Sequence, residues 1–125
     1  MLTVNNDWSN YLLNFHWTHT ATVRLHYRLS EYSADLITTS LVKYKPIQYL
    51  FYCVENDRDD INHIHLILSS KGRIDRSSVA KGLGRYGKSV SYLEKVKSQE
   101  AIARYCTKHL NKGIPFDLKF KHQYL

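Results

Sequence analysis

The sequence predicts an α+β domain, in which helices pack on an antiparallel sheet. Two observations support this class. Segments in which apolar and polar residues alternate, as in strands, take turns along the chain with segments of helical periodicity. Their order is strand, helix, strand, strand, helix, strand, helix, and a short polar turn joins the two adjacent strands as in a hairpin. This order fits a sandwich of the ferredoxin-like or split βαβ type.

Each of the three predicted helices follows a residue that can cap a helix. Ser30 precedes the first, Asp75 the second and Ser98 the third. The side-chain oxygen of such a residue accepts a hydrogen bond from a backbone N–H of the first turn, which has no partner within the helix. We therefore expect helices over residues 30–44, 76–83 and 99–110.

Four segments alternate in the manner of strands, and they span residues 12–27, 47–55, 61–69 and 89–96. The first is a long strand or a pair of strands, with Thr20 and Arg24 on its polar face. That face could meet a phosphate or simply water. The second is apolar on both faces until its end, which favours a central position in the sheet.

The length of 125 residues predicts one domain, with residues 1–10 as a flexible arm and residues 114–125 as a flexible tail. Cys53 and Cys106 match no zinc or redox spacing, so we expect reduced core thiols in an intracellular protein. No apolar run reaches the roughly 18 residues of a membrane span, and the N-terminus has no signal pattern. We therefore expect no membrane partner.

The chain is basic, with a net charge of +7, and its Lys and Arg residues are densest between Lys71 and Lys121. This favours a phosphate-rich partner such as nucleic acid. Ten tyrosines and two tryptophans offer surfaces on which bases could stack. Solubility alone is the alternative explanation of the charge.

The strongest candidate site is in the third predicted strand, where His63 and His65 are two residues apart. Residues at this spacing face the same side of a strand, so the two imidazoles project together, as in half of a metal site. The polar turn at residues 56–60 would return the chain as a hairpin and bring Glu55 close to both histidines. Glu55 is therefore the best third ligand, although a polar sheet face is the simpler alternative.

The segment Lys81 to Lys88 contains a G-x-G-x-x-G pattern. We reject a dinucleotide site, because that fingerprint must follow a strand and open a helix, whereas this segment follows a helix and precedes a strand. A basic glycine loop can still hold phosphates through backbone N–H groups. Lys81, Arg85 and Lys88 are therefore candidates for DNA-backbone contacts, and a flexible turn is the alternative.

Tyr105 and Lys108 are one turn apart on the last predicted helix. Beside a metal ion that polarises a phosphodiester, a tyrosine oxygen could attack phosphorus and a lysine could neutralise charge. A packed tyrosine and a solvated lysine are the alternatives.

These residues lie in motifs that resemble a known family. His63-Ile64-His65 resembles the HUH motif, named for two histidines around a hydrophobic residue. Tyr105-Cys106-Thr107-Lys108 resembles the Y-x-x-K motif of rolling-circle replication initiators. The stretch from Cys53 to Glu55, the polar turn and the run from Asn62 to Leu66 are similar to the corresponding region of the Rep proteins of small circular single-stranded DNA viruses. The resemblance covers residues 15–113.

The resemblance implies the HUH endonuclease fold and a metal-dependent, site-specific endonuclease and strand transferase that acts on single-stranded DNA. His63, His65 and Glu55 would hold Mg²⁺ or Mn²⁺. Tyr105 would form a covalent 5′-phosphotyrosine, Lys108 would steady the phosphate, and the reverse step would rejoin the strands. Further DNA contacts are expected from these five residues: Lys81, Arg85, Lys88, Thr20 and Arg24.

The implied partner is a replication origin, in single-stranded or hairpin form, of a virus or plasmid. The implied location is the host cytoplasm for a prokaryotic host and the nucleus for a eukaryotic virus. Two alternatives stay open. One is a single-tyrosine HUH transposase with the same chemistry, and the other is a non-catalytic nucleic-acid-binding domain of the RNA-recognition type.

Overall fold

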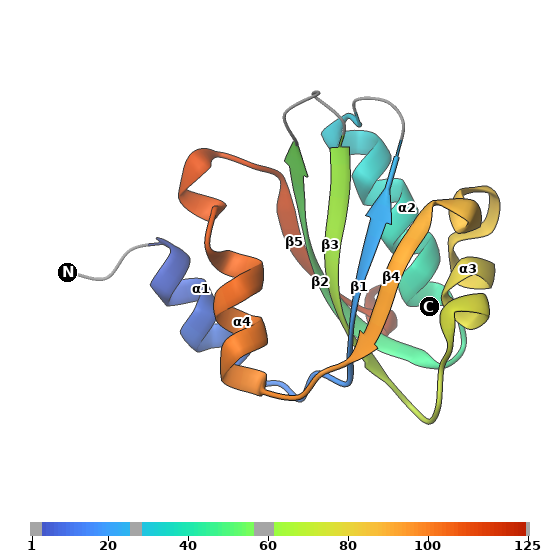
Figure 1. The fold of residues 1–125 in the computed structure, drawn as a ribbon, viewed down its shortest axis with the longest axis horizontal. Coiled ribbons are helices and arrows are strands. Elements are labelled where there is room, and N and C mark those ends of the chain that lie inside the picture. The colour runs from blue at the N-terminus through green and yellow to red at the C-terminus, as the bar shows by residue number, and fades with distance from the viewer. Residues whose placement is uncertain (1–3, 26–28, 57–61, 125) are drawn as a thin grey trace.

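The computed structural model describes residues 4–25, 29–56 and 62–124. A five-stranded sheet forms its centre, with the strands in the order β4-β1-β3-β2-β5 (Figure 1). All neighbouring strands are antiparallel. The predicted α+β class with an antiparallel sheet is therefore confirmed. The strands are β1 (His19–Arg24), β2 (Ile47–Asn56), β3 (Asn62–Ser70), β4 (Val90–Lys95) and β5 (Phe116–Phe120).

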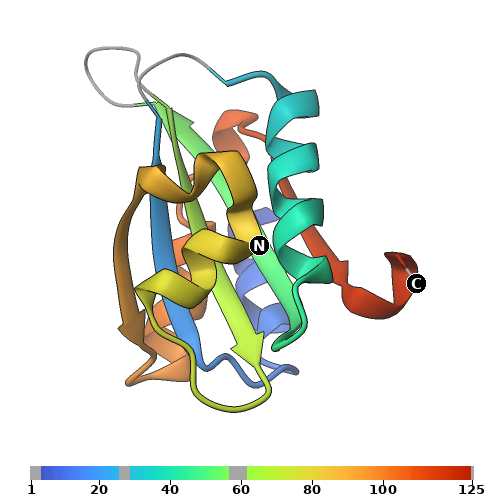
Figure 2. The ribbon, with the colours of Figure 1, turned by 90° about the vertical axis from the view of Figure 1, so that its right-hand side faces the viewer.

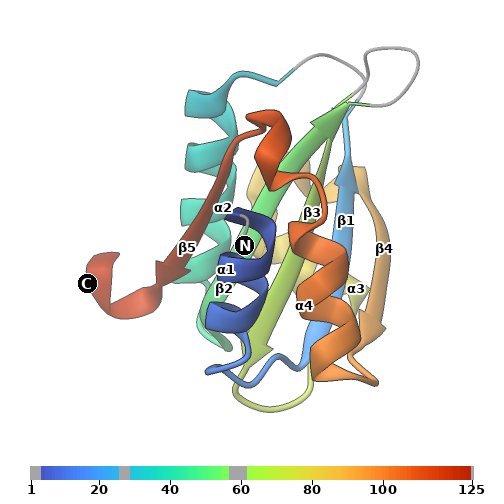
Figure 3. The same cartoon turned by 90° about the vertical axis from the view of Figure 1, so that its left-hand side faces the viewer.

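Helices cover both faces of the sheet. Helices α2 (Glu31–Lys43) and α3 (Arg76–Leu83) lie on one face (Figure 2). Helices α1 (Val4–Leu12) and α4 (Gln99–Thr107) lie on the other (Figure 3). None of the helices in the described ranges is long and apolar enough to cross a membrane. Three short 3₁₀ helices complete the secondary structure, at Gly84–Ser89, Leu110–Lys112 and Lys121–Tyr124.

All three predicted caps are confirmed. The side chains of Ser30, Asp75 and Ser98 accept hydrogen bonds from backbone N–H groups in the first turns of α2, α3 and α4, respectively. These starts are set locally, because the capping residue and its partner are three residues apart.

Alternation along β3 divides its side chains between two apolar cores. Ile64, Leu66 and Leu68 are fully buried in the core beneath α2 and α3. Ile67 belongs to the core beneath α1 and α4. His63 and His65 share the face of Ile67, because residues two apart point to the same side of a strand.

The N-terminal segment differs from the predicted flexible arm. Residues Val4–Leu12 form α1, in which Leu12 is fully buried and the Trp8 ring packs against the rings of Phe51 and Phe116. The asparagine-rich sequence has a low intrinsic helix propensity, so tertiary packing stabilises this helix. The first strand is also shorter than predicted and begins at His19.

The C-terminal segment likewise differs from the predicted flexible tail. Phe116–Phe120 forms the edge strand β5, which pairs with β2. Its Lys119 side chain is buried and donates hydrogen bonds to Asp35, Thr38 and Thr39 of α2. These interactions, remote in sequence, explain why residues 116–120 pack on the domain.

Candidate active site

The β2–β3 hairpin brings Glu55 and the two histidines together. Glu55 lies directly opposite His63, and Cys53 lies opposite His65. Glu55 Oε2 is 3.8 Å from His63 Nε2 and 3.6 Å from His65 Nε2. The three side chains are partly buried, with 13–18 % of each exposed.

The donor set fits a divalent metal ion. The candidate ligand atoms of Glu55, His63 and His65 all lie within 4.8 Å of one another. Two atoms that each lie about 2.1 Å from one ion are about 3.0 Å apart at a right angle and about 4.2 Å apart on opposite sides. The two imidazole–carboxylate distances fall within this interval, so small side-chain movements would complete the coordination. Three protein ligands also leave coordination positions for a substrate, as in catalytic rather than structural sites.

The carboxylate at the centre of this cluster is ionised at neutral pH. The imidazole of His65 lowers the pKa of Glu55, and the charges of His109 and His63 act in the same direction, while partial burial opposes them. The sulfur of Cys53 lies 3.9 Å from Glu55 Oε1. Burial raises the pKa of the Cys53 thiol, so Cys53 is a neutral neighbour and not a thiolate ligand.

Helix α4 is held at both of its ends. At its start, the Gln99 side chain exchanges hydrogen bonds with the backbone N–H and carbonyl of Trp17, at 2.8 and 2.7 Å. Beyond its end, Asn5 of α1 donates to the Lys108 carbonyl at 3.0 Å and accepts from the Asn111 backbone at 2.8 Å. These contacts, with the burial of Ala103 and Cys106 against the sheet, fix where α4 presents its remaining side chains.

Among these side chains is Tyr105, which lies beside the histidine pair. Its ring is edge-on to the His65 ring, with 5.7 Å between the centroids. Tyr105 is 47 % exposed and is therefore open to a ligand. Lys108, which caps the C-terminus of α4, places Nζ over the Tyr105 ring, 4.2 Å from its centroid. Burial and the charge of Glu55 raise the pKa of Tyr105, so the phenol is neutral near pH 7.

An open groove adjoins this cluster. One cavity of about 430 Å³ extends from His65 and Tyr105 towards β4, and a neighbouring cavity of about 300 Å³ continues to the start of α4. Both are lined by Thr20, Glu94, Ile102 and Tyr105. We call the two cavities together the active-site groove. The first is also lined by Thr22, His65 and Tyr92.

The five predicted DNA contacts lie in two separate places. Thr20 lines the active-site groove, and Arg24 of β1 lies opposite His63 of β3. Lys81 is on α3, whereas Arg85 and Lys88 are on the following 3₁₀ helix. Both of these elements lie on the other face of the sheet, which separates all three residues from the histidine pair.

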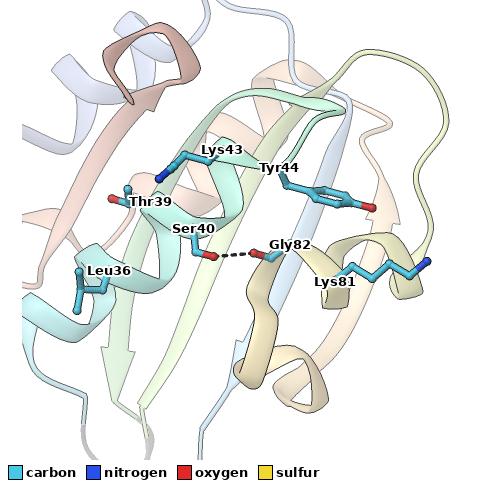
Figure 4. A pocket seen from close by; sticks show the side chains of 7 residues that line it. All are labelled: Leu36, Thr39, Ser40, Lys43, Tyr44, Lys81 and Gly82. Atoms are coloured by element: carbon cyan, nitrogen blue, oxygen red, sulfur yellow. Dashed lines mark hydrogen bonds between the residues drawn. The ribbon is translucent and has the colours of Figure 1, made fainter. Parts of the chain in front are cut away.

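Lys81 lines a cavity of about 460 Å³ between α2 and α3 (Figure 4). Lys43 and Tyr44 line the same cavity, and the Ser40 hydroxyl donates to the Gly82 carbonyl at 2.9 Å. The structure therefore does not bring the basic segment Lys81 to Lys88 together with the candidate metal ligands.

The glycines of this segment are explained by packing and backbone conformation, without any ligand. A Cβ atom on Gly82 would lie 2.7 Å from Leu41 of α2, so glycine allows the two helices to approach. Gly84 has a φ of +62°, which a side chain disfavours. A Cβ on Gly87 would lie 2.6 Å from the Ala80 carbonyl oxygen. The segment consists of the end of α3 and a 3₁₀ helix, and it does not form an open loop around a phosphate.

The groove also contains residues that the sequence did not single out. Thr22, Tyr92 and Glu94 face it through the pairing of β1 with β4. His109 is close enough to lower the pKa of Glu55. The alternation of Tyr92 and Glu94 along their strand was visible, but their partner strand depends on long-range pairing.

Comparisons with protein-family models, with curated proteins and with solved structures find no match to this chain. The function is therefore inferred from the geometry and chemistry of the site, together with the sequence motifs that led to it.

Proposed function

We propose that the protein is a metal-dependent endonuclease and strand transferase of the HUH type, which acts on single-stranded DNA. The observation that supports this best is the meeting of three groups. An exposed tyrosine lies beside His65, one of three candidate metal ligands, and a lysine ammonium lies over the tyrosine ring. The net charge of +7 supports a polyanionic substrate.

Glu55, His63 and His65 would hold Mg²⁺ or Mn²⁺. Imidazole nitrogen is a softer ligand than Mg²⁺ prefers, so Mn²⁺ is expected to bind more tightly. When bound, the ion polarises the phosphodiester and offsets the negative charge that raises the pKa of Tyr105.

In the proposed reaction Tyr105 Oη attacks the phosphorus of a phosphodiester. A bond forms between Oη and phosphorus, and the bond from phosphorus to the 3′ oxygen breaks. The phenol proton passes to water, and the leaving 3′ oxygen takes a proton to become a hydroxyl. One DNA end is then linked to Tyr105 through its 5′-phosphate, and the 3′-hydroxyl can reverse the step and rejoin the strand.

Lys108 has two roles in this proposal. Its ammonium group, 4.2 Å from the centroid of the Tyr105 ring, favours the negative charge that develops on the phenol oxygen. It also supplies a positive charge for the non-bridging oxygens of the phosphate. Its place at the end of α4, next to the Asn5 contact, restrains the backbone from which it extends.

The biological role that the motifs favour is initiation of rolling-circle replication, because the released 3′-hydroxyl can prime DNA synthesis. The DNA would be an origin in single-stranded or hairpin form. A single-tyrosine transposase would use the same chemistry, and strand-exchange assays on element ends distinguish the two. A non-catalytic binder is the second candidate function, favoured by the exposed Tyr92 and Tyr105 rings on the groove.

The test is incubation of the protein with a pool of single-stranded DNA and Mn²⁺, followed by denaturing electrophoresis. We expect a protein–DNA adduct that survives denaturation, and we expect Tyr105→Phe and His63→Ala to abolish it. Tyr32→Phe is the matched control, since Tyr32 is 71 % exposed on α2, on the other face of the sheet. If Tyr105→Phe forms the adduct as well as the wild type does, the proposed nuclease is wrong.

A further inference from the structure

We propose that the active-site groove contains a nucleobase site that selects a base with an exocyclic amino group and disfavours thymine, and that Glu94 makes this selection. The inference rests on the proposed function in one respect, because it takes single-stranded DNA as the ligand. It adds a sequence preference that neither the metal ligands nor Tyr105 provides.

The pairing of the strands places this site next to the candidate metal ligands. Tyr92 of β4 lies opposite Thr22 of β1, and Thr22 lies opposite His65 of β3. The three side chains therefore form one row on the same sheet face. Since neighbouring strands are about 4.8 Å apart, Tyr92 lies roughly 10 Å from His65 along this row. A nucleotide there would neighbour the phosphate that Tyr105 attacks.

The sides of the groove suit the flat face of a base. Tyr92 is 45 % exposed and Tyr105 is 47 % exposed, and both line the cavity of about 430 Å³. Aromatic side chains that remain open to solvent in a basic protein are typical stacking surfaces for single-stranded DNA. Stacking does not distinguish between bases, because every base has an aromatic face.

The polar groups of the groove do distinguish between bases. The Thr20 hydroxyl donates to the Leu66 carbonyl at 3.1 Å, so it can only accept from a ligand. Glu94 lies opposite Thr20 on β4, and its carboxylate is an acceptor without donors. At the Thr20–Glu94 pair, these acceptors favour a ligand group that presents an N–H, whereas Lys95 and Lys97, which line the groove near the start of α4, suit the phosphates of the same strand.

A carboxylate in a nucleic-acid groove also requires an explanation, because it repels phosphates. Its only ion pair within the described ranges joins Glu94 Oε1 to Lys97 Nζ at 3.3 Å, and the Lys97 side chain is 86 % exposed. An exposed pair of this kind contributes little and does not neutralise Glu94 firmly. An amino group of a base would give Glu94 a charge-assisted hydrogen bond.

Cytosine and thymine differ at the position that Glu94 would read. Cytosine presents an N4 amino donor, whereas thymine presents the O4 acceptor and a methyl group. Glu94 would accept from the first and repel the second. We expect a preference of about tenfold, which corresponds to about 1.4 kcal/mol. Adenine and guanine also carry amino groups, so thymine is the base that the site disfavours.

The experiment measures DNA binding by fluorescence anisotropy with Mn²⁺ in the Tyr105→Phe variant. This variant cannot form the covalent bond to DNA, but it keeps the aromatic ring at position 105 as a stacking surface. The probes are labelled oligodeoxycytidine and oligodeoxythymidine of equal length. We expect about tenfold tighter binding of the cytidine probe. Glu94→Ala should bring the two dissociation constants together, and Glu94→Gln should leave a smaller preference.

Glu100→Ala is the matched control, because it removes one negative charge from an exposed position of α4 outside the groove. This variant should bind both probes more tightly by the same factor, so the ratio of the two dissociation constants should stay the same. Tyr92→Ala should weaken both probes by a similar factor, since it removes stacking only. Circular dichroism confirms that each variant is folded.

Three results would overturn the base site: equal or tighter binding of the thymidine probe, an unchanged preference in Glu94→Ala, or no binding of either probe. The result is independent of the adduct assay. If the protein binds the cytidine probe more tightly but forms no covalent adduct, the proposed nuclease is wrong and the protein is a base-selective binder. If the protein forms the covalent adduct but binds both probes equally, the proposed base site is wrong and the proposed nuclease stands.

Discussion

Two lysine–tyrosine pairs lie on opposite faces of the sheet and differ in what surrounds them. Beneath α2, Lys119 Nζ is 5.3 Å from the centroid of the Tyr52 ring. Beside α4, Lys108 Nζ is 4.2 Å from the centroid of the Tyr105 ring. Lys119 and Tyr52 are buried, at 0 % and 3 % exposed, whereas Tyr105 is 47 % exposed.

The ammonium group of the buried pair has all of its hydrogen-bond partners within the protein. Lys119 Nζ donates to Asp35 Oδ1 at 2.6 Å, to the Asp35 carbonyl at 2.7 Å, and to the hydroxyls of Thr38 and Thr39 at 2.8 Å. An ammonium group has three N–H donors, and these four acceptors share them, so no donor is left over. In the exposed pair, Tyr105 instead lines a groove next to three converging ligand atoms, and Lys108 Nζ lies over the Tyr105 ring. The same two residue types therefore stabilise the fold in one place and lie beside a candidate site in the other.

The largest expected effect is on metal binding beside the exposed pair. His63→Ala should weaken Mn²⁺ binding by more than about 100-fold, because even the loss of an outer partner of a ligand often costs 10- to 100-fold. Isothermal titration calorimetry measures this. His16→Ala, at an exposed histidine outside the cluster, should leave the affinity unchanged. Equal affinities for the two variants would contradict the metal assignment.

The second effect concerns stability and the buried pair. Asp35→Asn leaves the Lys119 ammonium buried without its carboxylate, so we expect the free energy of unfolding to fall by about 2 kcal/mol. This lies below the usual range for a broken buried pair, because the Asp35 side chain is 52 % exposed. Glu100→Gln, which weakens the exposed pair with Arg104, should change it by less than about 0.5 kcal/mol. Urea unfolding measures the free energy of unfolding of both variants. If the two variants lost similar amounts, the buried pair would contribute no more than the exposed ion pair.

The third effect is a dependence of stability on pH. Burial, with the charges of Asp117 and Asp35, raises the pKa of Tyr52 to about 12. An unfolded tyrosine loses its proton near pH 10, so the stability from Tyr52 is complete below pH 10 and is lost as the pH rises towards 12.

We expect this group to lower the free energy of unfolding by about 1.4 kcal/mol for each pH unit in that interval. Tyr52→Phe should remove the contribution. Unfolding curves at pH 9, 10 and 11 compare the two proteins, and parallel pH dependences would show that Tyr52 does not titrate in this way.

The smallest expected effect is on the rate of the proposed reaction. Lys108→Met should slow adduct formation by roughly fivefold to tenfold, or about 1.0–1.4 kcal/mol, because it removes the positive charge and keeps much of the packing. Lys108→Arg should restore most of the rate. Lys112→Met, at an exposed lysine in the next 3₁₀ helix, serves as the control. A loss of equal size in the control would indicate a general effect of charge.

The sequence predicted those elements whose signals are local. The caps at Ser30, Asp75 and Ser98 and the alternation along β2 and β3 place helices and strands within a few residues of their observed bounds. It also predicted that Glu55, His63 and His65 meet, because one hairpin register is enough to bring them together.

The sequence failed where structure depends on distant contacts. Helix α1 has weak propensity and depends on the packing of Trp8 and Leu12. Strand β5 does show alternation of Phe116, Leu118 and Phe120, but over five residues only, and its pairing with β2 is a long-range contact. The placement of Lys81 and Arg85 behind the sheet, and of Tyr92 and Glu94 beside His65, follows from strand order, which no local pattern encodes.

The proposed nuclease is tested most sharply by identifying the residue that carries the DNA. The adduct formed with Mn²⁺ would be digested with protease and nuclease, and the modified peptide would be sequenced by mass spectrometry. We expect a single 5′-phosphonucleotide, and we expect it on Tyr105. Modification of a different residue, such as Tyr92 or Tyr32, or no covalent adduct under any metal condition, would contradict it.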